Sequence, residues 1–241
     1  MRKTVIKEFE KLGEDLSNYS AMFAYRLMNL CVKAEEVSLL SVQVPVDGEL
    51  QKLEECTTIS KKDEYSFMIF PIYDEELPAV GQGIMQVHPE FKQEIQSMTV
   101  KGVEINGTLA DKDVRYILVT MPEVDDNRYD VLKEGVQLCY DECKVLMETA
   151  NLKADARFAT LTVDEADEEM DRLKQVREQL NDQWNGQRDK IYNDKLQEIE
   201  DAHNKWLEEQ NEQEQKRQEE EAAHSESAAH SMKLNQDDYA S

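Results

Sequence analysis

Proline and glycine are scarce in this chain of 241 residues, which holds 5 Pro and 8 Gly. Both residues interrupt helices, so their scarcity favours long helical segments. All but one of the prolines lie within residues 37–121, which confines most helix-breaking residues to that part of the chain. No apolar run approaches the length of a membrane-spanning helix, and residues 1–11 lack the apolar core of a signal peptide. We therefore expect a cytoplasmic protein with no membrane partner.

Basic residues are also few, with 28 Lys and Arg against 52 Asp and Glu, which gives a net charge of −24. Binding to nucleic acid depends on Lys and Arg that neutralise phosphates. A chain this acidic should repel RNA, DNA and anionic lipid over most of its surface. The composition excludes a DNA-binding protein and favours a protein partner with a basic surface.

Cysteine occurs only four times, without the spacing of a paired-cysteine motif, which indicates reduced thiols and no disulfide framework. Cys139 and Cys143 are four residues apart, a spacing that suits either two metal ligands or two packed core residues. A zinc site needs four ligands, and no further ligands lie close in the sequence, which favours packing. No phosphate loop, nucleophile elbow or Cys/His order is present. We expect no enzyme activity, no cofactor and no metal.

Apolar residues recur every three or four positions in three long segments, 3–35, 122–160 and 162–215, as in amphipathic helices. The third segment begins with a capping-box pattern, Thr162 with Glu165, and would form a rod of roughly 80 Å. Its stripe consists of Ala166, Met170, Leu173, Val176, Leu180, Trp184, Ile191, Leu196, Ile199, Ala202 and Trp206. A rod of this length cannot bury its own stripe, so it requires partner helices. Trp206, near the end of the stripe, is either core or a partner contact.

Between the first two helical segments the periodicity changes to that of strands. Residues 42–46 alternate before an Asp47-Gly48 hairpin signal, and residues 65–70 are rich in β-formers. Residues 76–87 have the pattern of a short helix. Residues 103–105, an Asn106-Gly107 turn and residues 115–121 predict further strands.

These patterns predict an α+β protein in which a small β/α domain is inserted into a three-helix bundle. The expected parts are 1–36 as the first bundle helix, 37–121 as the inserted domain, and 122–210 as the second and third bundle helices. Beyond Gln210 the apolar stripe ends and the sequence becomes polar and of low complexity. We expect 211–241 to be a disordered acidic tail that follows the long C-terminal helix.

Three segments carry a family resemblance: the step 38–40 with Gly48 after a short alternating strand, the run 72–80 followed by Ile84 and Met85, and 113–116 followed by Pro122 and Arg128. In these segments and in element order, residues 1–207 resemble ribosome recycling factor. The resemblance implies an L-shaped molecule whose bundle and β/α domain meet at a hinge. It also implies a non-enzymatic translation factor that binds the ribosome and acts with a translocase GTPase.

The resemblance places the hinge at the two domain boundaries, Glu35 with Glu36 and Met121 with Pro122. The family carries arginines at its hinge, whereas acids stand at this place here. Its second bundle helix carries an arginine cluster that touches ribosomal RNA, but 144–153 keeps only two bases and gains Glu148. A glutamate facing phosphate converts attraction into repulsion.

Four bases of the second bundle helix and its start are candidate ribosome contacts: Arg128, Lys144, Lys153 and Arg157. Alternatively, they are surface bases paired with neighbouring acids. Two functions therefore stay open. The first is a recycling-type factor that promotes dissociation of ribosomal subunits after termination. The second is a repurposed acidic helical module that has lost RNA binding and engages a basic protein.

Overall fold

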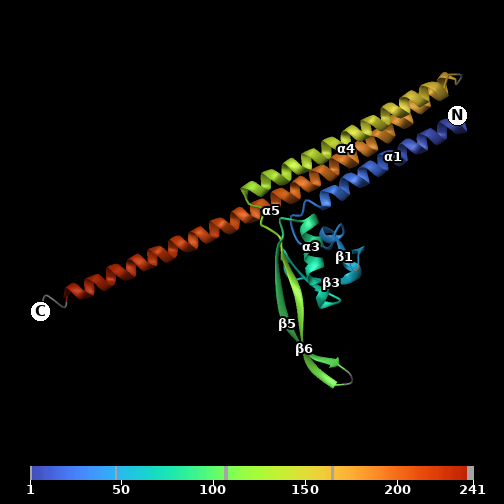
Figure 1. Ribbon diagram of the computed structural model, residues 1–241. Helices are drawn as coiled ribbons and strands as arrows, with labels where there is room; N and C mark the ends of the chain where they lie inside the picture. The colour runs from blue at the N-terminus through green and yellow to red at the C-terminus, as the bar shows by residue number, and fades with distance from the viewer. Residues whose placement is uncertain (1, 47, 106–107, 164–165, 238–241) are drawn as a thin grey trace.

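Three long helices form a bundle: α1 (Lys3–Met28), α4 (Asp126–Leu161) and α5 (Asp167–Asp237). They lie side by side in the computed structural model, with α1 and α5 both packed against α4 (Figure 1). The structure describes residues 2–46, 48–105, 108–163 and 166–237, without the side chains of 36, 103–110 and 224–237. The predicted packing of distant segments into one three-helix bundle is confirmed.

Each bundle helix buries one face, and the buried positions keep the three- and four-residue spacing of the sequence. One chain of aromatic rings crosses all three helices. The Phe23 ring on α1 lies 6.3 Å from that of Tyr140 on α4, which lies 4.6 Å from that of Tyr192 on α5. Besides Phe23, the fully buried bundle residues include Val5, Leu12, Leu16, Leu27, Val136, Met147, Phe158, Leu173 and Ile199.

The inserted domain, called here the sheet domain, contains a four-stranded antiparallel sheet in the order β3-β4-β6-β5. Its strands are β3 (Thr57–Lys61), β4 (Ser66–Pro71), β5 (Lys92–Ile105) and β6 (Thr108–Thr120). A separate hairpin joins β1 (Gln43–Val46) to β2 (Glu49–Lys52). Gly48 has φ +85° in this turn, a conformation that favours glycine, while Asp47 lies outside the described residues.

Short helices complete the sheet domain: α2 (Leu53–Cys56), α3 (Leu77–Val87) and the 3₁₀ turns η1 (Glu36–Leu39) and η2 (Asp74–Glu76). Helix α3 agrees closely with the predicted 76–87. It packs its apolar face over the sheet, and the resulting core contains Val44, Leu53, Phe67, Ile69, Leu77, Val80, Ile84, Ile117 and Val119. This core is separate from that of the bundle.

Strands β5 and β6 form a ribbon that extends far beyond the rest of the sheet (Figure 1). Strand β4 pairs with β6 only between Ile117 and Thr120, so the outer part of the ribbon has two strands alone. The sequence predicted only 103–105 of β5, because residues 97–102 and 111–113 are all exposed and leave no alternating apolar pattern. The predicted turn Asn106-Gly107 lies outside the described residues.

Two helix boundaries differ from the prediction. Helix α1 ends at Met28 and not near residue 35, because the apolar residues that prolong its pattern, such as Val32, are buried at the domain junction instead. Helix α5 begins at Asp167, and Thr162 caps the end of α4 by donating its hydroxyl to the Phe158 carbonyl at 2.7 Å. Glu165, the other half of the predicted capping box, lies outside the described residues.

The C-terminal segment also differs from the expected disordered tail at 211–241, because α5 continues as a helix to Asp237. Residues 207–223 are all exposed, so packing does not hold this part in shape. It is rich in Glu and Gln and contains neither Gly nor Pro, a composition that favours a helix intrinsically. We call residues 207–237 the arm; residues 238–241 lie outside the description.

The molecule has three limbs that meet at one junction (Figure 1). The bundle runs one way from the junction, the sheet domain leaves it at an angle, and the arm continues the line of α5 on the far side. The predicted L shape of bundle and sheet domain is present, and the arm adds a limb. Among the described residues, no helix combines the length and apolarity needed to cross a bilayer.

Candidate functional site

The junction is organised around the turn between β3 and β4, at Glu64 and Tyr65. The Ala34 N–H, in the first chain connection, donates to the Glu64 carbonyl at 2.7 Å. The Met121 N–H, in the second connection, donates to the Tyr65 carbonyl at 2.8 Å. Both connections are therefore anchored to adjacent residues, which fixes where the sheet domain leaves the bundle.

The predicted hinge residues lie at this junction in different environments. Met121 is fully buried in the sheet-domain core, and Pro122 beside it is half-buried. Glu35 is exposed and pairs with Lys33 at 3.3 Å. Glu36 begins η1, and its side chain lies outside the described residues. Their role as a hinge stays a prediction.

The last packed turns of helix α5 contact the junction. The sequence patterns did not predict this contact. Lys205 pairs with Glu64 and lies over the Tyr65 ring, 5.2 Å from its centroid. The hydrogen bond to Glu64 raises the pKa of Lys205, and burial raises the pKa of Tyr65. Polar residues such as Glu64 and Lys205 give no periodic signal, so only the fold brings them together.

A second set of contacts joins α5 to the start of α4. The Nδ1–H of His203 donates to the Val124 carbonyl at 3.0 Å. The imidazole stacks on the Tyr129 ring with centroids 4.4 Å apart, and it also stacks with the Trp206 ring at 5.7 Å. Trp206 is half-buried, and every described residue of α5 after it up to residue 223 is exposed.

Arg128 lies inside the junction and not on an open surface. Its Nη2 donates to the Cys31 carbonyl at 2.8 Å, which ties α4 to the connection that follows α1. Burial lowers the pKa of this guanidinium, and the nearby Glu90 carboxylate partly opposes that effect. The side chain that the sequence offered as a ribosome contact is half-buried and engaged within the chain.

We expect Arg128→Met to lower the free energy of unfolding by about 1–3 kcal/mol, because the Cys31 carbonyl loses a charged donor. Urea unfolding followed by far-ultraviolet circular dichroism measures this change. Lys144→Met is a matched control on the same helix, since Lys144 is exposed, and its effect should stay within about 0.5 kcal/mol. Equal effects of the two substitutions would contradict a structural role for Arg128.

The other three candidate bases are on the surface of α4. Lys144 and Lys153 are exposed, and no ion pair involves them within the described part of the chain. Arg157 donates to both carboxylate oxygens of Glu8 on α1, at 3.0 and 3.2 Å. Arg157 is therefore paired with a neighbouring acid, which was the predicted alternative to a ribosome contact.

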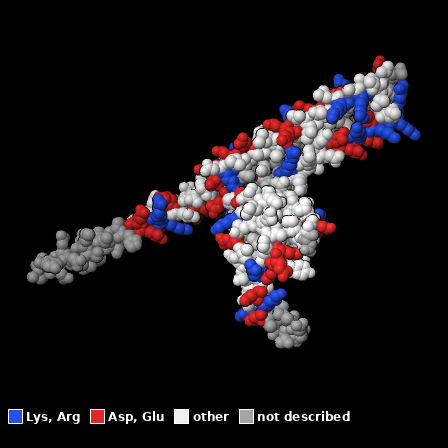
Figure 2. All heavy atoms as spheres, viewed as in Figure 1, with Lys and Arg blue, Asp and Glu red and all other residues white. Residues whose placement is uncertain are grey.

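Basic residues gather at the end of the bundle formed by the start of α1, the end of α4 and the start of α5, which we call the bundle tip (Figure 2). Lys3, Lys7 and Lys11 are spaced four apart and share one exposed face of α1. Like charges at this spacing destabilise a helix slightly. None of these three lysines forms an ion pair with any described residue. The strongly negative net charge of the whole chain conceals this line of lysines in the sequence.

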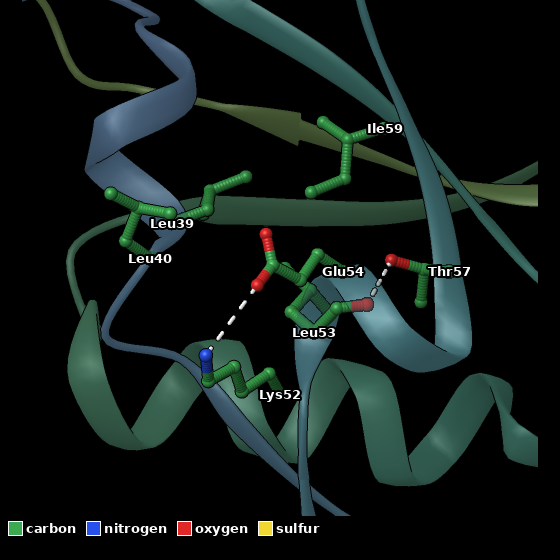
Figure 3. Close-up of a pocket in the computed structure, with 7 residues that line it drawn as sticks. All are labelled: Leu39, Leu40, Lys52, Leu53, Glu54, Thr57 and Ile59. Carbon is green, nitrogen blue, oxygen red and sulfur yellow. Dashed lines mark hydrogen bonds and ion pairs between the residues drawn. The ribbon is translucent and has the colours of Figure 1, made fainter.

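The sheet domain has a small hollow of about 270 Å³ between η1, α2 and β3 (Figure 3). Leu39, Leu53 and Ile59 supply apolar wall. Its polar groups bind one another: Lys52 pairs with Glu54 at 3.7 Å, and the Thr57 hydroxyl donates to the Leu53 carbonyl at 2.6 Å. This hollow presents no combination of a nucleophile and a base.

Cys139 and Cys143 both pack in the bundle core. The Cys143 thiol is fully buried and lies 3.7 Å from the Tyr19 carbonyl, and burial raises the pKa of both thiols. Thiols of raised pKa are poor metal ligands at neutral pH. Within the described residues no group of three metal-ligating side chains converges.

The fold matches a solution structure of the ribosome recycling factor, with a TM-score of 0.63 and 17% sequence identity. The match covers 83% of this chain and 100% of that structure. This chain has the recycling-factor fold.

A second similar structure comes from models for the T. thermophilus ribosome recycling factor and the E. coli elongation factor G bound to the E. coli post-termination complex. It has 14% identity and a TM-score of 0.49, over 81% of this chain and 98% of that one. No protein-family model matches the sequence. No curated protein matches it either. The recycling-factor fold is therefore established by shape and not by sequence.

Proposed function

We propose that this chain is a non-enzymatic, ribosome-associated factor of the recycling type, which contacts ribosomal RNA through the bundle tip. The observation that carries the proposal is the match to the whole of the recycling factor structure, both bundle and sheet domain. A body of two limbs held at an angle is suited to wedging between two larger surfaces. In this proposal the protein works with a translocase GTPase and has no chemistry of its own.

The charge distribution supports the tip as the place of RNA contact. Residues 2–11 contain four bases and two acids, within a chain whose net charge is −24. Lys3, Lys7 and Lys11 form a line of cations that has no partner among the described residues. Such a line suits successive phosphates, whose neutralisation releases counterions.

Sedimentation with intact bacterial ribosomes tests the proposal. If three lysines contact phosphates, we expect binding to weaken roughly 20- to 40-fold between about 50 and 200 mM salt. The triple substitution Lys3→Glu, Lys7→Glu and Lys11→Glu should abolish co-sedimentation at either salt concentration. The matched control is Lys61→Glu, Lys62→Glu and Lys112→Glu, which changes the charge equally on exposed lysines of the sheet domain and should leave binding intact.

Two results would count against this function. Absence of wild-type co-sedimentation at low salt would overturn ribosome association itself. Binding that survives the tip substitutions would instead relocate the contact. Subunit splitting by the protein with a translocase GTPase and GTP, measured by light scattering, then distinguishes recycling from mere binding.

A second candidate function, an acidic module that engages a basic protein, is favoured by one observation. The helix α4 carries Glu134, Asp141 and Glu148 on the side turned away from the bundle. Carboxylates there repel phosphate, whereas in the recycling factor family arginines of this helix are expected to face RNA.

A further inference from the structure

Helix α4 carries a second apolar stripe on the side opposite its buried face. Its members are Val131, Leu138, Val145 and Leu152, each separated from the next by seven residues. Their exposed fractions are 67%, 60%, 59% and 70%. The core positions of α4, such as Val136 and Met147, lie on the other side of the helix and are already filled by α1 and α5. The outer stripe therefore serves no packing within the described chain.

The spacing of the outer stripe distinguishes it from scattered surface residues. Single exposed apolar side chains are normal in soluble proteins. A seven-residue repeat keeps one position of each heptad facing the same neighbour along a left-handed supercoil, although a full coiled-coil seam has apolar residues at two positions per heptad. The stripe extends over about 32 Å at the helical rise, long enough for a partner helix of three to four heptads. The spacing and the length of the outer stripe therefore indicate a helix as its binding partner.

Acids border this stripe. The positions three and four residues from stripe members include Glu134, Asp141, Glu142, Glu148 and Asp155, and from 134 to 156 these positions hold no base. Lys144 and Lys153 are adjacent in sequence to stripe residues and so lie about 100° round the helix, on its flanks. Figure 2 shows acidic groups along α4 with uncharged surface between them.

Two of these acids are paired within the bundle, Glu142 with Arg26 of α1 and Asp155 with Arg177 of α5. Glu134, Asp141 and Glu148 form no ion pair with any described residue. A hollow of about 540 Å³ beside the stripe is lined by Leu138, Val145 and Leu146 with Arg26, Asp141 and Glu142. The outer face of α4 therefore combines an apolar stripe with acidic borders, which suits a partner that is both apolar and basic.

We propose that the outer face of α4 binds a basic amphipathic helix of a partner protein. The partner's apolar residues repeat every seven positions against the stripe, and its Lys and Arg side chains meet the bordering acids. A second copy of this chain fits poorly, because either orientation places the acidic borders of two α4 helices together. Nucleic acid is repelled by the same carboxylates. The inference does not rest on ribosome binding, which we assign to the bundle tip.

A synthetic helix is the probe for this site. It has four heptads with leucine at the stripe-facing positions and lysine on both sides, and a scrambled peptide of equal composition keeps the charge but loses the repeat. Fluorescence anisotropy should show the ordered peptide binding at least tenfold more tightly than the scrambled one. Equal affinities would overturn the proposal, since charge alone would then explain the binding.

Substitutions on α4 test whether the peptide binds to the outer stripe. Leu138→Ser with Val145→Ser should weaken binding at least tenfold. Asp141→Asn with Glu148→Gln should weaken it about three- to tenfold and flatten its salt dependence. Leu50→Ser with Tyr73→Ser removes apolar groups that are 67% and 62% exposed on the sheet domain, and should change nothing.

Sedimentation equilibrium tests whether a second copy of this chain binds to the outer face of α4 instead. We expect the protein to be a monomer with and without the Leu138→Ser and Val145→Ser changes. A wild-type dimer that these changes dissociate would assign the face to a second copy and overturn the proposal. Circular dichroism checks that each variant keeps its helix content, as expected for exposed positions.

Discussion

Replacing Phe23 with alanine is expected to lower the free energy of unfolding of the bundle by about 3–5 kcal/mol. Phe23 is 1% exposed and its ring meets that of Tyr140 edge-on, so its removal leaves a cavity where all three helices converge. A loss of this size is a large share of the roughly 5–15 kcal/mol by which domains are stable. Urea unfolding followed by tryptophan fluorescence reports it, because Trp184 and Trp206 both lie on α5.

Met22→Ala is the matched control for Phe23→Ala. Met22 precedes Phe23 on α1 but is 37% exposed. Its truncation should cost less than about 1 kcal/mol, since little buried surface is lost. If Phe23→Ala cost no more than Met22→Ala, the three helices would not share the core described above.

Gly83→Ala is expected to destabilise the sheet domain by about 1–3 kcal/mol while leaving the bundle unchanged. A Cβ atom at this position would lie 2.4 Å from the Gln43 carbonyl oxygen, which is backbone and cannot rotate away. Helix α3 must therefore move off β1. Hydrogen exchange of the β4 and β6 amides should accelerate, and that of the bundle amides should not.

Gly186→Ala is the contrasting control, because no described atom outside the surrounding turns of α5 lies within 4 Å of a Cβ at that position. Alanine there should stabilise the helix by up to about 1 kcal/mol. Uniform acceleration of exchange across both domains in Gly83→Ala would contradict the separation of the two cores. It would indicate that bundle and sheet domain unfold as one unit.

The bundle could be predicted from sequence because its information is periodic. Residues such as Leu16, Met147 and Leu173 recur on one helical face, and three such faces in one chain have few ways to be buried. The inserted domain followed from the change of period between residues 37 and 121. The outer ribbon of β5 and β6 could not be predicted in full, because exposure on both faces removes the alternation.

The junction was accessible to sequence analysis only in outline. The resemblance located the two chain connections, but nothing in the sequence indicates that Glu64 and Tyr65 receive both of them and Lys205 as well. Arg128 shows the same limit, since the direction of a guanidinium depends on the fold around it. The lysine line on α1 was present in the sequence at four-residue spacing and was hidden by the overall acidity.

The arm has a steric consequence for any complex that this protein enters. At the helical rise, residues 207–237 reach about 45 Å past the junction as a rod about 10–12 Å wide. A cavity shaped only for the bundle and sheet domain would collide with it. The binding site must therefore leave a straight open space along the axis of α5, on the side away from the bundle tip. A binding site without this space can accept the protein only after the arm has bent or unfolded.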